Sequence, residues 1–452
     1  MQKLKQELDK KKKLYHSNKR EIIVSICLVI LVFGSMLGYL VYFTETNEQE
    51  MINNSYNSRQ QILLSRNYRG MIYSRDGDVL AETSLDWEEN EQRVYPYGNL
   101  FAHVVGYATE GKMGIEALAN FYLINSNVSI SEKVANDTAG IKNPGDNVYT
   151  TLDVELQKIA DEQLGLYDGA VVVTEVKTGK ILAMASNPDF DPNKIDVIWD
   201  DLIKNKESSV LVNRAVQGLY PPGSTFKIIT ALEYIRENPK SYDQYSFQCP
   251  GYFKVEGNLI HCYNSSVHGR IDLKTSFAKS CNSSFANIGV NLDKESFAET
   301  LDKLLFNQKL PIALSHEMST IQVDENTAAY EMMQTAIGQG KTLITPLHLN
   351  LITCAVANKG ILMKPYLIDH VESSDGKIVK TFKQEEYGRL LSETESEVLT
   401  ELMAEVVISG TARRKLGQME YTAAGKTGSA EYNDELTVLT TLKDVQSGAE
   451  VV

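Results

Sequence analysis

Hydrophobic and polar positions divide the chain into three regions. Residues 22–43 are predominantly apolar and contain no charged side chain. At ~1.5 Å per residue, a helix of this length spans about 33 Å, close to the ~30 Å hydrocarbon core of a bilayer. Residues 44–147 mix short strand-like pieces with polar turns, whereas apolar residues recur densely from residue 148 onward. We therefore predict a transmembrane helix at 22–43, a small α+β module at 44–147 and a mixed α/β domain at 148–452.

Within the larger domain, the pattern predicts a β-hairpin followed by several helices. Residues 169–176 and 181–185 are apolar runs, and Lys177, Thr178 and Gly179 form the turn between them. Apolar residues at helical spacing predict helices at 224–236, 273–292, 346–357 and 393–409.

Charge around the apolar segment predicts its orientation in a membrane. Residues 1–21 contain seven lysines and Arg20, against Glu7, Asp9 and Glu21. By the positive-inside rule, residues 1–21 form a cytoplasmic tail and everything after residue 43 lies outside. A cleaved signal peptide is the alternative. The apolar run exceeds the usual ~7 to 15 residues, however, and residues 44–47 offer no small-residue cleavage site, which favours an uncleaved single-pass anchor.

Net charge and cysteine content further limit the kinds of protein that this chain can be. The chain of 452 residues has a net charge of -14, and removing the +5 of residues 1–21 leaves -19, which argues against a nucleic-acid partner. Five cysteines are few for an exported chain of this size. Cys249 and Cys262 suit one disulfide or two free thiols. A zinc site with His261 and His268 is less favoured, because the spacing matches no compact metal motif.

A serine followed three residues later by a lysine is the first candidate for catalysis. Ser224 and Lys227 share one helix face, so the amine can reach the hydroxyl and activate it as a nucleophile. The same spacing recurs at Ser276 with Lys279 and at Ser374 with Lys377. Ser276 falls inside a predicted helix and Ser374 in a turn, whereas Ser224 follows a Pro-Pro-Gly breaker at a helix start. We therefore select Ser224, with an ordinary helix cap as its alternative.

Two further motifs follow Ser224 in the chain. Ser280 and Asn282 form a Ser-x-Asn motif 56 residues later, and Lys426, Thr427 and Gly428 form a Lys-Thr-Gly motif that precedes Ser429. An earlier Lys-Thr-Gly copy at residues 177–179 lies in the predicted hairpin turn. We expect residues around Lys426 to form an edge strand, in which Gly428 lets a ligand backbone approach closely.

Ser-x-x-Lys, Ser-x-Asn and Lys-Thr-Gly in this order are typical of penicillin-binding proteins and class A β-lactamases. The chain resembles class B penicillin-binding proteins, which are membrane-anchored D,D-transpeptidases of peptidoglycan synthesis. Residues 69–81 resemble the family's N-terminal box, with Ser74 where an aspartate is usual. Residues 114–116 resemble its Gly-Leu-Glu segment, and residues 338–340, followed by Thr345 and Pro346, resemble its Gly-Gln-Gly loop.

The resemblance implies a fold and a set of catalytic roles. The fold would be a β-lactamase-like transpeptidase domain with an antiparallel central sheet and a helical subdomain, behind a pedestal at 44–147. Ser224 would attack the carbonyl of the penultimate D-Ala of a stem peptide. Lys227 would accept the serine proton, Ser280 and Lys426 would relay it to the leaving amine, and Asn282 would hold Lys227 and the substrate amide. Which lysine acts as the base stays open.

The same resemblance implies binding residues and partners. Thr427 and Ser429 would bind the terminal carboxylate beside Lys426, with Gly428 between them, and the backbone N–H groups of Ser224 and Ser429 would form an oxyanion hole. Donor and acceptor stem peptides and β-lactams are the expected ligands, and no cofactor or metal is expected. Other cell-wall synthesis proteins are candidate partners of the pedestal in the bacterial cell membrane.

Three alternatives stay open at this point. Attack of water on the acyl-enzyme would make the protein a carboxypeptidase or a β-lactamase, although no motif supplies the carboxylate that a lactamase needs. A non-catalytic β-lactam sensor or scaffold is the third, and the intact catalytic motifs argue against it. Residues 44–147 are too few for a glycosyltransferase domain.

The resemblance weakens after Glu431. The family continues through two more strands of the central sheet and a closing helix, whereas 21 residues remain here and 436–442 does not resemble the expected aromatic-rich strand. The strand that carries Lys426 would then expose a hydrophobic edge. Our hypothesis for this part is a truncation or a reading-frame change near Asp434.

Overall fold

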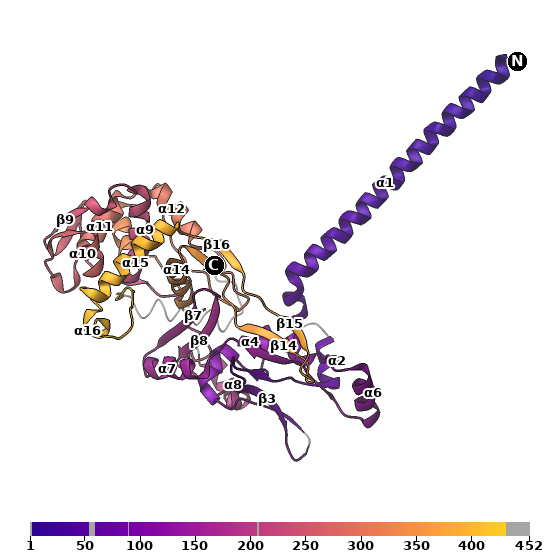
Figure 1. The fold of residues 1–452 in the computed structure, drawn as a ribbon, viewed down its shortest axis with the longest axis horizontal. Coiled ribbons are helices and arrows are strands. Elements are labelled where there is room, and N and C mark those ends of the chain that lie inside the picture. Colours follow the sequence, from indigo (N-terminus) through magenta and orange to yellow (C-terminus); the bar gives the residue numbers. More distant parts are fainter. Residues whose placement is uncertain (1, 54–58, 89, 206–207, 431–452) are drawn as a thin grey trace. The chain divides into compact units, whose positions relative to one another are not determined.

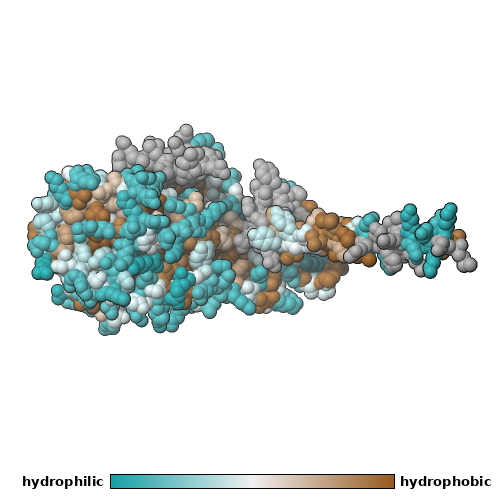
Figure 2. All heavy atoms as spheres, turned by 90° about the horizontal axis from the view of Figure 1, so that it is seen from above, coloured by the Kyte–Doolittle hydropathy of each residue, from teal (hydrophilic) through white to brown (hydrophobic). Residues whose placement is uncertain are grey.

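A computed structural model describes residues 2–53, 59–88, 90–205 and 208–430 (Figure 1). The chain falls into two compact units, residues 1–62 and 63–452. The first unit contains a single long helix, α1 (Gln2–Asn53). Its segment Glu21–Phe43 is long and apolar enough to cross a membrane, and the side chains there are solvent-exposed. They appear brown on the helix in Figure 2. The predicted apolar helix is therefore present, in the form that a membrane anchor or a signal sequence takes.

The second unit begins with a six-stranded mixed sheet in the order β15-β14-β6-β2-β3-β4. The pair β2 and β6 is parallel and the other neighbours are antiparallel. β14 and β15 come from residues near 370, so the sheet joins the N-terminal module to a distant part of the chain. The predicted boundary between residues 147 and 148 stays a prediction.

The elements of this part have the following bounds: α2 (Arg59–Arg66), β1 (Asn67–Tyr68), β2 (Ile72–Tyr73), β3 (Val79–Leu85), β4 (Glu91–Val94), α3 (Ala102–Val105), α4 (Gly114–Leu118), α5 (Asn120–Ile124), α6 (Ile130–Ala139), β5 (Asn143–Pro144), β6 (Asn147–Thr150), β14 (Ile368–Glu372) and β15 (Ile378–Thr381).

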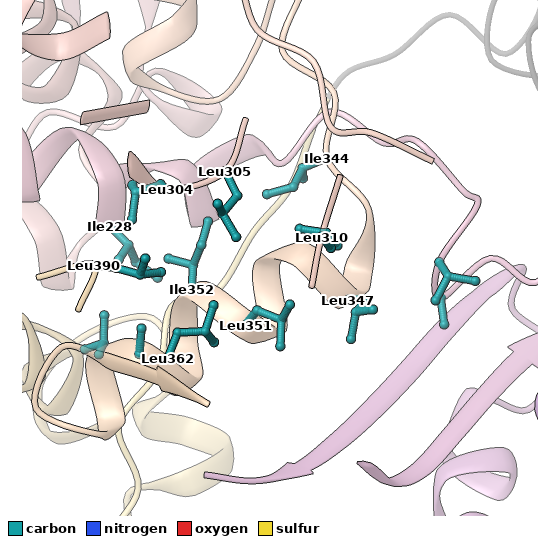
Figure 3. Close-up of a cluster of buried hydrophobic side chains, with 14 of the residues drawn as sticks. Ile228, Leu304, Leu305, Leu310, Ile344, Leu347, Leu351, Ile352, Leu362 and Leu390 are labelled. Carbon is teal, nitrogen blue, oxygen red and sulfur yellow. The ribbon is translucent and has the colours of Figure 1, made fainter. Parts of the chain in front are cut away.

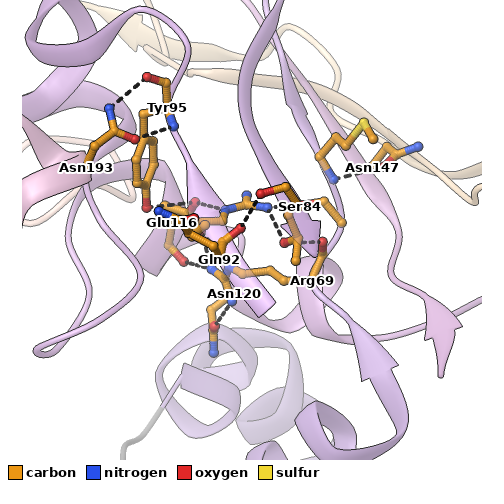
Figure 4. Close-up of polar contacts among 12 residues, drawn as sticks. Arg69, Ser84, Gln92, Tyr95, Glu116, Asn120, Asn147 and Asn193 are labelled. Carbon is orange, nitrogen blue, oxygen red and sulfur yellow. Dashed lines mark hydrogen bonds and ion pairs between the residues drawn. The ribbon is translucent and has the colours of Figure 1, made fainter. Parts of the chain in front are cut away.

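A buried ionic network holds this module together (Figure 4). Glu116 is fully buried, and its carboxylate accepts hydrogen bonds from Arg69 Nε at 2.6 Å and from Arg93 Nε at 2.7 Å. Arg69 also donates to Asn120 Oδ1, and Arg93 to the Gly70 carbonyl. Burial alone would raise the pKa of Glu116, but the two guanidinium groups outweigh it and hold that pKa below its usual value. The two sequence segments that resemble family motifs thus meet in one charge cluster.

Ser74 departs from the family pattern but keeps a turn in place. Its hydroxyl accepts hydrogen bonds from the backbone N–H groups of Asp76 and Asp78 and donates to the Asp78 carboxylate at 3.0 Å. A serine hydroxyl can cap a turn in this way as an aspartate does, though more weakly.

The larger part of the unit contains the predicted hairpin and a helical half. β7 (Gly169–Glu175) and β8 (Lys180–Asn187) pair in antiparallel register, with the turn at residues 176–179. α7 (Val154–Leu164) packs on β8, and α14 (Pro346–Ala357) packs on β7. Figure 3 shows the core around α14, where Leu347, Leu351 and Ile352 meet buried leucines and isoleucines of other segments.

The remaining elements of this part are α8 (Ile195–Lys204), α9 (Lys227–Glu237), β9 (Ser246–Cys249), β10 (Tyr252–Val255), β11 (Asn258–His261), β12 (Gly269–Asp272), α10 (Leu273–Ala278), α11 (Asn282–Asn291), α12 (Lys294–Lys303), α13 (Ala329–Ala336), β13 (Ile361–Met363), β16 (Glu386–Arg389), α15 (Glu393–Ile408) and α16 (Arg413–Leu416), with 3-10 turns η1 (Gly98–Phe101), η2 (Pro192–Lys194), η3 (Gly223–Phe226), η4 (Tyr242–Gln244) and η5 (Tyr263–Ser265).

Local capping signals explain where the helices begin. Thr345 caps α14 and Pro346 occupies its first turn, while Ser392 and Glu395 form a capping box at the start of α15. The helices predicted at 346–357 and 393–409 are confirmed. The single helix predicted at 273–292 is wrong, because Ser280 adopts a left-handed conformation with φ +54° and separates α10 from α11. Apolar periodicity continues across the break and therefore hides it.

The edge strand expected around Lys426 is also not observed. Residues 418–430 form no strand and pair with no strand in the part of the chain that the structure describes. The hypothesis of a truncation or frame change near Asp434 concerns residues 431–452, which lie outside the described residues.

Replacing Glu116 should test the buried network. Glu116→Gln keeps the shape but removes the charge that compensates two buried guanidinium groups, so we expect a loss of about 3–5 kcal/mol in the free energy of unfolding. A lowered thermal unfolding midpoint would report it. Glu393→Gln breaks the exposed pair with Lys359 and serves as the matched control, with little expected change. Equal midpoints for both variants would contradict a stabilising role for the network.

Candidate active site

Ser224 lies in the 3-10 turn η3, immediately before α9. Gly223 starts this turn with φ +55°, and its N–H donates to the Gly338 carbonyl at 2.8 Å. A Cβ on Gly223 would come within 2.3 Å of the Ser429 carbonyl oxygen, and one on Gly338 within 2.0 Å of the Gly223 carbonyl oxygen. Glycines at both positions therefore let three segments converge around the serine.

Lys227 occupies the first turn of α9 and is completely buried. Its amine lies 3.0 Å from Ser224 Oγ, 3.2 Å from Ser280 Oγ and 2.6 Å from Asn282 Oδ1. Burial in the first place, and the positive charge of Lys426 in the second, hold the pKa of Lys227 well below its usual range. A neutral amine has a lone pair that can accept the serine proton, so this environment favours a base.

Ser280 and Asn282 flank the break between α10 and α11. Ser280, at φ +54°, presents both its hydroxyl and its carbonyl to the Lys227 amine. Asn282 accepts from Lys227 through Oδ1 and donates through Nδ2 to the His261 carbonyl at 3.0 Å. The amide is thus oriented from two sides. The turn that apolar periodicity concealed is the feature that brings both residues to Lys227.

Lys426 completes the polar cluster from a separate segment. Its amine donates to Ser280 Oγ at 2.9 Å and to the Thr427 carbonyl at 3.0 Å. Burial lowers the pKa of Lys426 to about 8. The Thr427 hydroxyl lies 2.6 Å from the Thr411 hydroxyl, which fixes the segment against the turn after α15.

Gly428 has a packing role in addition to the ligand-binding role expected from sequence. A Cβ at this position would come within 2.8 Å of Thr225 Cγ2, next to the nucleophile. The small residue therefore allows the Lys-Thr-Gly segment to pack on η3, rather than only leaving room for a ligand. Ser429 is exposed and faces the same cleft.

The cleft has a volume of about 680 Å³ and contains most of the residues selected from sequence. Ser224, Ser280, Asn282, Thr427, Gly428 and Ser429 line it. Tyr263, His268, Thr411 and Arg414 also line it and were not predicted to belong to this site. Thr411 and Arg414 follow a glycine at the end of a predicted helix, which is the only sequence signal for them. Tyr263 and His268 lie in a polar loop without any motif.

Lys279 of the rejected Ser276 copy lines the cleft, whereas the other residues of the rejected motif copies do not line it. Ser276 is buried in α10, where its hydroxyl accepts from the Ser284 hydroxyl at 2.8 Å. Lys377 pairs with Asp375 in the turn between β14 and β15. Residues 177–179 form the turn between β7 and β8.

The arrangement provides a continuous hydrogen-bonded path. It runs from Ser224 through Lys227 and Ser280 to Lys426, with successive distances of 3.0, 3.2 and 2.9 Å. Such a path can take a proton from an attacking hydroxyl and deliver it to a leaving group on the other side of the cleft.

Two family models match the chain. The penicillin-binding protein transpeptidase domain matches residues 169–442, more than half of the chain, and the penicillin-binding protein A dimerisation domain matches residues 69–148. The transpeptidase model includes η3, the α10–α11 break and the Lys426 segment.

Whole-chain relatives agree with these matches. The peptidoglycan D,D-transpeptidase PbpA of Mycolicibacterium smegmatis is 29% identical over 93% of this chain and 88% of its own length. PbpA of Mycobacterium tuberculosis is 30% identical over 83% of this chain and 80% of its own length.

Solved structures agree as well. Penicillin-binding protein A from M. tuberculosis, as an imipenem acyl-enzyme complex, superposes with a TM-score of 0.73 at 27% identity, covering 81% of this chain and 88% of that one. The fold class and the family predicted from the motifs are confirmed. This chain belongs to the penicillin-binding protein transpeptidases, with a penicillin-binding protein dimerisation domain in front of the transpeptidase domain.

Proposed function

We propose that this protein is a peptidoglycan D,D-transpeptidase that crosslinks stem peptides ending in D-Ala-D-Ala through an acyl-serine intermediate. The hydrogen-bonded path from Ser224 to Lys426 carries the proposal. Family membership and the D,D-transpeptidase relatives support the reaction class.

Acylation begins with attack by Ser224 Oγ on the carbonyl carbon of the penultimate D-Ala. Its proton passes to the neutral Lys227 amine, which lies 3.0 Å away in the resting enzyme. Collapse of the tetrahedral intermediate breaks the amide C–N bond. Ser280 and Lys426 then deliver a proton to the departing D-Ala nitrogen, so that the leaving group is a neutral amine.

Deacylation uses the same groups in the reverse direction. An amine from a second stem peptide attacks the ester carbonyl and loses a proton to Lys227 or, through Ser280, to Lys426. The Ser224 oxygen then leaves and regains its proton. The result is a new peptide bond between two stem peptides and a regenerated enzyme.

Substrate recognition falls to the segment after Lys426. Thr427 and Ser429 supply hydroxyl groups, and Lys426 a positive charge, for the terminal carboxylate of the donor peptide. The backbone N–H groups of Ser224 and Ser429 stabilise the oxyanion that forms in the transition state, and Asn282 binds the substrate amide. The tight packing of Gly223 against Ser429 supports this pairing of donors. A β-lactam mimics the D-Ala-D-Ala end and acylates Ser224. The acyl-enzyme complexes of the M. tuberculosis structures support this.

The chain is further proposed to act from outside the bacterial cell membrane. Residues 22–43 form an uncleaved single-pass anchor, residues 1–21 stay in the cytoplasm, and the pedestal at 44–147 and the catalytic domain at 148–452 lie outside. The basic residues before the apolar helix support this orientation. The pedestal is the proposed docking module for other cell-wall synthesis proteins.

Labelling with a fluorescent penicillin should depend on Ser224. The full-length protein in detergent should form a covalent adduct, Ser224→Ala should form none, and Ser374→Ala, an exposed serine of a rejected motif copy, should label like the wild type. An adduct on Ser224→Ala would overturn the assignment of the nucleophile.

The same preparations, given a pentapeptide donor and an amine acceptor, should yield crosslinked product by mass analysis. Mainly hydrolysed product would favour a carboxypeptidase, and labelling without turnover would favour a sensor.

The second-order rate constant for acylation by the fluorescent penicillin should depend on pH with a bell-shaped profile. The rate rises as Lys227 loses its proton, well below the usual lysine pKa of 10.5, because burial lowers that pKa. It should fall above about pH 8 as Lys426 loses its charge. Lys426→Arg stays charged at alkaline pH and should lose the falling limb, at a lower maximum rate. A rate constant that keeps rising up to pH 10.5, the usual pKa of a lysine, would contradict Lys227 as the base.

Membrane topology can be read from spheroplasts. The chain should stay in the membrane fraction after alkaline washing. Protease added outside should digest the catalytic domain, while an epitope fused before Met1 should survive, because basic residues hold that end inside. Release of a soluble chain that lacks the apolar helix would instead indicate a cleaved signal peptide.

A further inference from the structure

Four potential metal ligands converge beside the active site. They are Cys249 at the end of β9, Cys262 after β11, His268 before β12 and Cys281 at the start of α11. One ligand atom from each lies within 4.8 Å of all the others. The end of β9, the loop between β11 and β12 and the start of α11 thus meet at one point, and His268 also borders the catalytic cleft.

Four of the six distances among these atoms are close to the edges of a tetrahedron around a metal ion. The three sulfur pairs are 3.7 Å (Cys249 and Cys262), 3.6 Å (Cys262 and Cys281) and 3.5 Å (Cys249 and Cys281) apart. His268 Nδ1 is 3.4 Å from Cys249 Sγ. Tetrahedral Zn²⁺ with Zn–S bonds of about 2.3 Å and Zn–N bonds of about 2.05 Å has edges of about 3.8 Å between sulfurs and about 3.5 Å between sulfur and nitrogen.

We propose that Cys249, Cys262, Cys281 and His268 bind one structural Zn²⁺ ion that holds the catalytic Ser-x-Asn turn in place. Three thiolates and one imidazole are a ligand set of structural zinc sites, which are closed and four-coordinate. A disulfide would bring two sulfurs to ~2.05 Å and leave the third alone, whereas the three separations here are nearly equal. The thiols lose their protons when the ion binds.

Polar neighbours are placed to stabilise the thiolates. The Ser283 hydroxyl lies 2.9 Å from Cys262 Sγ, and the Ser284 backbone N–H donates to Cys281 Sγ at 3.4 Å. Donors of this kind around the ligands orient them and balance their charge in metal sites. Neutral thiols in an apolar cluster would not need such hydrogen-bond donors.

The segment that carries most of the ligands has little other core. Of residues 246–272, only Cys249, Gly251, Ile260, Cys262 and Ile271 are buried. Two-stranded hairpins are marginally stable on their own, and a bound metal supplies the missing stabilisation in small elements. The segment thus needs a crosslink, and two of its four buried side chains, Cys249 and Cys262, are proposed ligands.

The site is connected to catalysis through two chain segments. Cys281 stands between Ser280 and Asn282, and Ser280 holds a left-handed conformation that costs energy for a residue with a side chain. On the other side, the His261 carbonyl next to Cys262 accepts a hydrogen bond from Asn282. A metal that fixes Cys262 and Cys281 therefore fixes both ends of the contact that orients Asn282 toward Lys227.

The sequence favoured a disulfide or free thiols and no metal. The ligands are separated by 13, 6 and 13 residues, so they match no compact motif, and Cys281 falls within the single helix predicted at 273–292. All five cysteines are free in the structure, and the disulfide between Cys249 and Cys262 is not formed there.

Metal content of the purified full-length protein in detergent tests the site directly. The wild type should contain about one zinc per chain, and Cys262→Ser and His268→Ala should each lose most of it, about tenfold at subsaturating zinc. Cys354→Ser, which removes another buried cysteine, should retain the wild-type content. His268→Cys should also bind zinc, because four thiolates are an alternative ligand set. Wild-type protein without zinc, equal zinc in the ligand variants, or a Cys249–Cys262 disulfide found by mass analysis would overturn the site.

A second measurement separates metal binding from folding and catalysis. Replacing zinc with Co²⁺ should give the visible absorption of tetrahedral thiolate coordination in the wild type and not in Cys262→Ser. Removing zinc from the wild type with a chelator should slow penicillin acylation about tenfold, and added Zn²⁺ should restore the rate. Unchanged acylation after zinc loss would overturn the proposed link to the Ser-x-Asn turn. Because metal content is read independently, it distinguishes failure of this site from failure of the transpeptidase assignment.

Discussion

The burial of one amine is the constraint on which the active site depends. Lys227 is removed from water, and three polar residues of the cleft point at its nitrogen. A buried ammonium would need a compensating charge. Among the hydrogen bonds that the described residues make with the Lys227 amine, each partner is an uncharged hydroxyl, amide or carbonyl oxygen. Lys426, the neighbouring charge that shifts the pKa of Lys227 most, is also positive. The site is therefore organised to keep this lysine neutral, and its geometry follows from that requirement.

Much of the site could be predicted from sequence because short motifs report local chemistry. Ser224, Lys227, Ser280, Asn282 and Lys426 were selected by order and context, and they meet in space as the resemblance implied. The hairpin and the helices of residues 346–357 and 393–409 followed from periodicity and capping. These features depend on neighbours within a few residues, so a sequence pattern can describe them.

Features that depend on distant contacts were predicted less well. The left-handed Ser280 interrupts a helix although the apolar pattern runs through, because tertiary contacts hold that conformation. Gly428 was predicted to leave space for a ligand, and its close packing on Thr225, about 200 positions earlier in the chain, was not predicted. The convergence of three cysteines and a histidine depends on how three separate segments pack together and could not be predicted from spacing.

The pairing of β14 and β15 with the N-terminal strands has a consequence for biogenesis. β6 pairs with β2 on one side and with β14 on the other. The hydrogen bonds of residues near 148 are therefore complete only after residues near 370 have been synthesised. During synthesis, the N-terminal module would pass through a period with an open sheet edge, which is a site for pairing with other chains. The sheet of the N-terminal module is therefore completed only by a later part of the chain. Dividing the gene between residues 147 and 148 would leave both pieces with unpaired strands.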